Sequence, residues 1–108
     1  MKISKELLKG STSTMILKII SKGDTYGYRI AQSLKEKSGN VFQLKEGTLY
    51  PILHALESDG YISSYKKTEA GRERKYYRIT VLGEAKLNNL VEEWSTFSKS
   101  VNDVLEEM

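Results

Sequence analysis

The chain has 108 residues, 39% of them hydrophobic and 29% charged, which suits one globular domain with a single core and excludes a two-domain enzyme. With no cysteine, one histidine and a net charge of only +3, it lacks the residues for disulfides, zinc fingers and catalytic triads, so we expect no enzyme activity, metal or cofactor. No apolar run exceeds three residues, whereas a transmembrane helix needs roughly 20. Since the first residues do not open a secretion signal either, we expect a cytoplasmic protein without membrane contact.

The first helix is predicted from about Ser4 to Gly23. Ser4 is a favourable N-cap residue, and Gly23 is a typical stop. Apolar residues recur along one side of this segment, at Leu8, Met15, Ile16, Ile19 and Ile20. The run from Gly10 to Thr14 has low helix propensity, so tertiary packing must hold it if it is helical.

A second, shorter helix of about 12 residues is predicted next. Asp24 or Thr25 is expected to cap it, and residues 38–40 provide the stop. Its apolar face contains Ile30, Ala31 and Leu34.

The third helix is predicted over Glu46–Asp59. Its apolar stripe has the spacing of one helical face, at Leu49, Ile52, Leu53 and Leu56. The opposite face contains Gly47, Pro51, His54 and Ser58, flanked by Thr48, Tyr50 and Ala55. Because the stripe is buried, this opposite face must meet solvent or a partner.

A β-hairpin is predicted from two segments rich in aromatic and branched residues, 61–68 and 74–80, joined by a polar turn at 69–73. Tyr76 and Tyr77 are neighbours on a strand, so one should face the core and the other the outside. Residues 61–78 contain six basic residues and two acidic ones, whereas residues 84–108 contain two basic and six acidic ones. Such a basic segment is typical of a protein that binds the phosphate backbone of nucleic acids.

The last helix is predicted from Val81 to the end, roughly 28 residues, with Thr80 as its cap. Apolar residues follow a spacing of three and four along it, at Leu87, Leu90, Trp94, Phe97, Val101, Val104 and Met108. This is the a/d seam of a coiled coil. The seam predicts a homodimer interface, and the alternative is that the helix packs back over its own domain.

This order of elements is typical of a winged helix-turn-helix, mainly α with a small β-hairpin, followed by a long C-terminal helix. Residues 1–80 would form the DNA-binding domain, with residues 46–59 as the recognition helix, and residues 81–108 the dimerisation helix. The chain also contains these motifs: Leu8-Lys-Gly10, Tyr26-Gly-Tyr28, Glu46-Gly-Thr-Leu-Tyr-Pro51, His54, Leu56-Glu57, Gly60 and Arg74-Lys-Tyr-Tyr-Arg-Ile-Thr80. From residue 7 to about residue 83 it resembles the PadR family of bacterial transcriptional regulators. Its C-terminal helix is similar to that of the small subclass of this family.

The resemblance implies a homodimeric, sequence-specific repressor that binds a palindromic operator in double-stranded DNA. The residues expected to contact DNA are Tyr26, Tyr28, Thr48, Tyr50, Pro51, His54, Lys66, Lys67, Arg72, Arg74 and Lys75. Their hydroxyl, imidazole and cationic groups suit bases and phosphates. Alternatively, His54 is simply exposed and Tyr50 packs at the edge of the stripe. For the whole chain, the alternative is a winged-helix module that binds another protein, but the basic hairpin favours DNA.

Trp94 is the only tryptophan and occupies an a position of the seam. Its side chain is too bulky for close helix pairing, so two copies of the helix would stay apart near it. In some PadR-like repressors an aromatic residue on this helix lines a pocket between the subunits. Trp94 and Phe97 therefore predict a site for a small planar aromatic effector, and the alternative is that Trp94 fills the dimer core.

Overall fold

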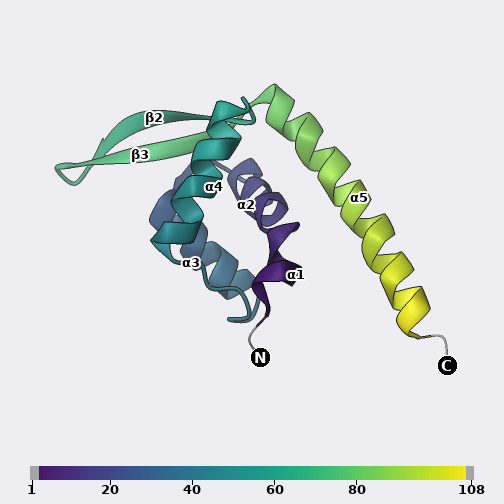
Figure 1. Cartoon of the computed structure of the whole chain (residues 1–108). Helices are drawn as coiled ribbons and strands as arrows, with labels where there is room; N and C mark the ends of the chain where they lie inside the picture. Colours follow the sequence, from purple (N-terminus) through teal and green to yellow (C-terminus); the bar gives the residue numbers. More distant parts are fainter. Residues whose placement is uncertain (1–2, 107–108) are drawn as a thin grey trace.

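The computed structural model describes residues 3–106, which form an elongated molecule of 59 × 31 × 20 Å. The elements are α1 (Lys5–Lys9), α2 (Thr12–Ser21), β1 (Thr25–Tyr26), α3 (Gly27–Lys37), α4 (Glu46–Ser58), β2 (Ile62–Glu69), β3 (Arg72–Ile79) and α5 (Val81–Leu105). Helices α1 to α4 gather into one body, from which the β2–β3 hairpin and α5 extend in different directions (Figure 1). The fold is the predicted winged helix-turn-helix with a long C-terminal helix, and the hairpin is its wing.

The predicted first helix is two helices, α1 and α2, separated at Gly10 and Ser11. Ser4 caps α1 as expected, because its hydroxyl accepts a hydrogen bond from the N–H of Leu7. The carbonyl of Leu8 then accepts hydrogen bonds from the Thr12 hydroxyl at 2.8 Å and the Ser11 hydroxyl at 3.3 Å. Hydroxyl side chains in this run therefore compete with the helical backbone for an acceptor, and a new helix begins at Thr12.

Neither Asp24 nor Thr25 caps the second helix, so this prediction was wrong. Thr25 and Tyr26 form β1, which pairs with Tyr77 and Tyr76 of β3, and α3 begins at Gly27. The result is a three-stranded antiparallel sheet in the order β1-β3-β2. Two residues are too few for a periodic pattern, so only the pairing with β3 reveals this strand.

The hairpin is in register from Ile62 opposite Ile79 to Glu69 opposite Arg72. The turn residues Ala70 and Gly71 both have positive φ, as tight two-residue hairpin turns require. Because side chains alternate along a strand, each face of the hairpin has its own set of residues. The outer face carries Tyr65, Lys67, Glu69, Arg72, Arg74, Tyr76 and Arg78.

The core is formed by α2, α3, α4, the start of α5 and the inner face of the sheet. The apolar stripe of α4 is confirmed, with Leu49, Leu53 and Leu56 buried and Ile52 partly buried. Tyr77 belongs to this core. Tyr76 faces the other side of the sheet, yet only 6% of it is exposed, because the rings of Tyr26 and Tyr65 pack against its ring. The two tyrosines therefore point to opposite faces of the sheet, as expected, but both of them are buried.

Helix α5 begins after Thr80, as predicted. The Thr80 hydroxyl accepts a hydrogen bond from the N–H of Gly83 at 3.0 Å and donates one to the carbonyl of Gly60 at 2.7 Å. The first turns of α5 pack on the rest of the chain, since Gly83 and Leu87 are buried and Leu90 packs against the core. Farther along, exposed apolar side chains follow at Val91, Trp94, Phe97, Val101, Val104 and Leu105. Met108, the last residue of the predicted seam, lies outside the described residues.

Candidate nucleic-acid interface

A groove of about 600 Å³ lies where the start of α3, the start of α4 and strand β3 meet. It is lined by Tyr26, Gly27, Tyr28, Glu46, Tyr50, Arg72, Glu73, Arg74, Lys75 and Tyr77. Six of these are residues predicted to contact DNA, and they come from three separate segments: Tyr26, Tyr28, Tyr50, Arg72, Arg74 and Lys75. The fold thus combines aromatic and cationic side chains in one concave surface.

The outward face of α4 carries the other predicted contacts of the recognition helix. Thr48, Pro51 and His54 are all exposed, and they do not line the groove. Pro51 lies near the start of the helix, where its missing N–H costs about one hydrogen bond at most. A helix with its apolar stripe buried and its polar groups outward can enter the major groove of DNA.

Tyr50 is held in the groove by close packing against Gly27. A methyl group added to Gly27 would lie 2.6 Å from the Tyr50 hydroxyl oxygen and 3.0 Å from the adjacent ring carbon. Glycine is therefore needed at the start of α3 to let the ring approach the backbone. Tyr50 remains 45% exposed, so it packs on one side while the rest of the ring is accessible.

Three lysines of the wing have exposed, weak ion-pair partners within residues 3–106. Lys66 pairs with Glu73 at 3.4 Å, Lys67 with Glu69 at 3.5 Å and Lys75 with Glu57 at 3.6 Å. The guanidinium of Arg74 lies 4.4 Å from the centre of the Tyr26 ring. Exposed ion pairs of this kind contribute about 0–1 kcal/mol, so phosphate oxygens can compete for these cations.

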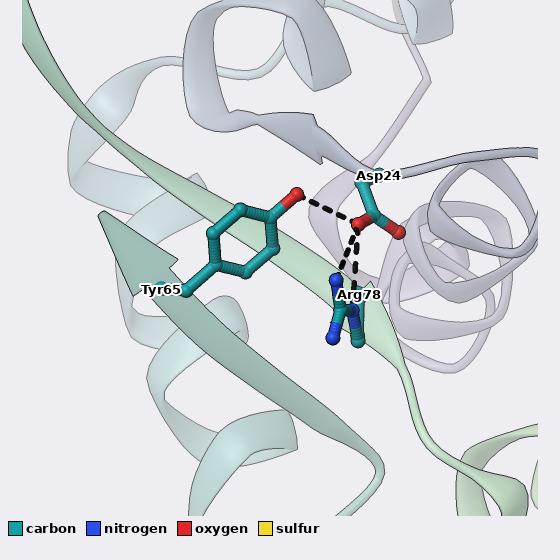
Figure 2. A network of polar contacts seen from close by, with 3 residues as sticks. All are labelled: Asp24, Tyr65 and Arg78. Carbon is teal, nitrogen blue, oxygen red and sulfur yellow. Dashed lines mark hydrogen bonds and ion pairs between the residues drawn. The ribbon is translucent and has the colours of Figure 1, made fainter. Parts of the chain in front are cut away.

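Two acidic residues that were not among the predicted site residues tie the wing to the helices. Glu57 of α4 accepts a hydrogen bond from the Ser64 hydroxyl and pairs with Lys75, and these two contacts, the first above all, lower the pKa of Glu57. Asp24 accepts a hydrogen bond from the Tyr65 hydroxyl at 2.7 Å and pairs with Arg78 at 3.1 Å (Figure 2). Tyr65 is the main cause of the lowered pKa of Asp24, with Arg78 contributing. No local pattern marks this role of Asp24, because its partners lie 41 and 54 residues farther along the chain.

The predicted dimer seam divides into two parts. Leu87 is buried in the core of its own chain, and Leu90 packs against that core while remaining partly exposed. The exposed fraction is 51% for Trp94, 57% for Phe97, 39% for Val101 and 70% for Val104. The rings of Trp94 and Phe97 lie 6.0 Å apart, and a shallow apolar hollow follows them, lined by Phe97, Ser100, Val101, Val104 and Leu105.

Within residues 3–106, no helix combines the length and the apolar character that crossing a bilayer requires. Over the same residues, no three histidine or carboxylate side chains gather closely enough to hold a metal ion.

Comparison with known proteins agrees with this geometry. Residues 16–89 match the transcriptional regulator PadR-like family. A transcriptional regulator of Mycobacterium tuberculosis is 34% identical over 77% of this chain and 75% of its own length. The negative transcriptional regulator PadR of Bacillus subtilis is 30% identical over 82% of this chain, which spans 49% of that protein. The crystal structure of a PadR-like transcriptional regulator from Bacillus cereus has a TM-score of 0.85 and 31% identity, covering 96% of this chain and 100% of that one.

The family match covers the groove, α4 and the wing together, and both relatives are named as regulators of transcription. The chain belongs to the PadR-like family of transcriptional regulators.

Proposed function

We propose that this chain is a repressor that binds a palindromic DNA operator as a homodimer. The observation that carries the proposal is the groove in which tyrosines of α3 and α4 meet cations of the wing, beside the outward face of α4. In this arrangement α4 enters the major groove, and the wing follows the neighbouring phosphates. Repression is supported by the Bacillus subtilis relative, which is named a negative regulator.

The second copy is expected to cover the exposed apolar face of α5. Trp94, Phe97, Val101 and Val104 would otherwise leave a large apolar patch in water. We divide the chain accordingly into a DNA-binding part, residues 1–80, and a dimerisation helix, residues 81–108. The first turns of α5, up to Leu90, also complete the core of the DNA-binding part.

A selection from randomised DNA duplexes tests the proposal as a whole. The enriched sequence should be an inverted repeat whose half-sites lie about 10 base pairs apart, or a multiple of that distance, because a two-fold dimer presents its recognition helices on one side of the duplex. Enrichment of an asymmetric sequence would argue against a dimer on a palindrome. A failure to enrich any sequence would favour the alternative, a protein-interaction module.

The first prediction concerns the wing cations. Replacing both Lys66 and Arg72 by alanine should weaken binding to all duplexes alike. The slope of the logarithm of the binding constant against the logarithm of the salt concentration should become less steep by about 0.9 for each phosphate that the wing no longer neutralises. Arg74 is left intact because it packs on Tyr26. Thr48→Ala should instead weaken operator binding more than non-specific binding, since Thr48 lies on the outward face of α4.

Fluorescence anisotropy at several salt concentrations measures both effects. Lys99→Ala is the matched control, because it removes one cation from α5, away from the groove. Its salt slope should equal that of the unmodified protein. An unchanged slope in the Lys66/Arg72 double variant would show that the wing does not contact phosphates.

The second prediction concerns an effector. Trp94 and Phe97 of the two copies would face one another, and a planar aromatic molecule could enter between them. Planar cationic dyes and phenolic acids should quench Trp94 fluorescence saturably and lower operator affinity, because a wedge between the α5 helices changes the spacing of the recognition helices. Trp94→Ala should abolish this effect on operator binding, compared at protein concentrations where ultracentrifugation shows the variant to be dimeric. If no compound of the panel quenches the fluorescence, the effector site is not there.

A further inference from the structure

The wing is a hairpin whose outer half has little support. Strand β1 pairs only with Tyr76 and Tyr77, so residues 72–75 of β3 have β2 as their neighbour in the sheet but not β1. Figure 1 shows the hairpin extending beyond the helices toward its tip. A two-stranded ribbon is marginally stable on its own, so the direction of the wing depends on how its base is anchored.

Asp24 anchors the outer face of that base to the helical body. It lies in the turn between α2 and β1, and one of its carboxylate oxygens, Oδ2, accepts hydrogen bonds from both strands of the wing. The Tyr65 hydroxyl of β2 donates at 2.7 Å, and the Arg78 guanidinium of β3 donates at 3.1 Å through Nη2 and 3.4 Å through Nε. Figure 2 shows the side chains of Tyr65 and Arg78 converging on this one oxygen of Asp24. Because Asp24 and Arg78 are both partly exposed, these contacts add little stability, but hydrogen bonds from two strands to one oxygen restrict the orientation of the base of the wing.

Tyr65 also ends a row of tyrosine rings that crosses the sheet. Tyr26, Tyr76 and Tyr65 occupy one register row, one on each strand. Neighbouring ring centres are 5.3 Å and 5.8 Å apart, within the range of favourable aromatic pairs. Tyr65, which is hydrogen-bonded to Asp24, therefore contacts Tyr26 at the edge of the groove through the ring of Tyr76.

Cations predicted to contact DNA rest on this row. Lys67 lies 5.0 Å from the centre of the Tyr76 ring, and Arg74 lies 4.4 Å from the centre of the Tyr26 ring. Holding a long cationic side chain against a ring limits its freedom before DNA arrives, which reduces the entropic cost of binding. The position of these cations follows from the position of the rings.

We propose that Asp24 and Tyr65 are positioning residues, which hold the wing and its cations in the orientation that lets wing and α4 engage DNA together. This inference rests on the proposed DNA-binding function. Neither residue lines the groove or lies on the outward face of α4, and the hydroxyl of Tyr65 is engaged by Asp24, so both act through the orientation of the wing.

The test asks whether removing the charge of Asp24 strengthens or weakens binding to DNA. Asp24→Asn removes a negative charge near a DNA-binding surface, so charge alone would strengthen binding to DNA. The positioning role has the opposite consequence: binding should weaken by roughly tenfold and the salt slope should fall by about 0.9 or more, because the wing neutralises fewer phosphates. Asp59→Asn is the matched control, because it removes the same charge from an exposed residue at the end of α4 that neither lines the groove nor contacts Tyr65 or Arg78. It should bind DNA as tightly as the unmodified chain or more tightly.

Tyr65→Phe provides a second variant that leaves the net charge and the ring unchanged. It should weaken DNA binding in the same direction as Asp24→Asn, and the double variant should be no weaker than Asp24→Asn alone, because the two residues share one contact. Binding is measured by anisotropy on a labelled duplex of mixed sequence, about 30 base pairs long, at several salt concentrations. Hydrogen exchange of residues 62–79 should be faster in both variants, while α4 exchanges as before.

The outcomes separate the two proposals. If the unmodified chain binds no duplex, the DNA-binding function fails and this inference fails with it. If the unmodified chain binds with the expected salt dependence, and both variants, still folded by circular dichroism, bind equally well, the positioning role alone is overturned. Tighter binding by Asp24→Asn than by the unmodified chain would overturn it as well.

Discussion

Replacing Phe97 and Val101 by glutamate is expected to convert the protein from a dimer into a folded monomer. Both side chains are exposed on the half of α5 that extends beyond the core, so the winged domain should fold unchanged. In the proposed dimer the same positions are buried between two helices, where an unpaired carboxylate costs several kcal/mol. The dimer would bury four such carboxylates, and the free energy that this costs exceeds the stabilisation that a seam of this length provides.

Dissociation of the dimer should also remove most of the affinity for the operator. Two linked recognition helices bind about 100-fold or more tightly than one, because the second contact is made within the same complex. Analytical ultracentrifugation at micromolar concentration and operator titration measure the two consequences. Ser95→Glu with Thr96→Glu adds the same charge to exposed polar positions of α5 outside the predicted seam, and should remain dimeric. If the unmodified protein is a monomer, or if the Phe97/Val101 variant still forms a dimer, the prediction that this face of α5 is the dimer interface is wrong.

Gly83→Ala is expected to destabilise the chain by about 3 kcal/mol, the upper range for an overpacked position. A methyl group at Gly83 would lie 2.0 Å from the carbonyl oxygen of Tyr61 and 2.8 Å from Cγ1 of Ile79. The Tyr61 oxygen cannot move aside freely, because it accepts a hydrogen bond from the N–H of Thr80 at 3.1 Å. The start of α5 would have to shift away from the junction of α4 and β2.

Thermal unfolding at one fixed protein concentration measures this effect. The melting temperature should fall by roughly 12–24 °C, given about 4–8 °C per kcal/mol for a domain of this size. Gly47→Ala is the control, and it is expected to raise the stability of the chain. A methyl group at Gly47 of α4 meets no atom within 4 Å, so alanine there should stabilise the helix by about 0.5–1 kcal/mol. Equal melting of Gly83→Ala and the unmodified chain would show that the junction is not tightly packed.

Much of the candidate interface was accessible from sequence because it depends on local patterns. The stripe of α4 identified its outward face, so the exposure of Thr48, Pro51 and His54 follows from helical periodicity alone. Alternation and turn residues located the wing and its cations. The sequence could not show that Tyr28, Tyr50 and Arg72 line one groove, because that depends on how α3, α4 and β3 pack together.

Contacts between distant segments decided what these local patterns left open. Asp24 was predicted to cap a helix, since aspartate before a helical stripe is a common cap, but long-range partners on the wing compete for its carboxylate. Leu87 and Leu90 continue the heptad spacing of Trp94 and Phe97, yet they pack on their own chain. Spacing shows which residues share one face of a helix, but it does not show which surface covers that face.

The sequence by itself therefore determined helix α4 with its outward face, the basic wing, the capped start of α5 and the family, because periodicity, turns, caps and motifs act over a few residues. Only the tertiary structure decided the break between α1 and α2, the two-residue strand β1, the Asp24 anchor and the point where the exposed seam begins. Each of these depends on contacts between segments far apart in the chain, or on competition between such contacts and local preference. The physical reason is that a short segment with weak propensity adopts the conformation that its neighbours in space stabilise most.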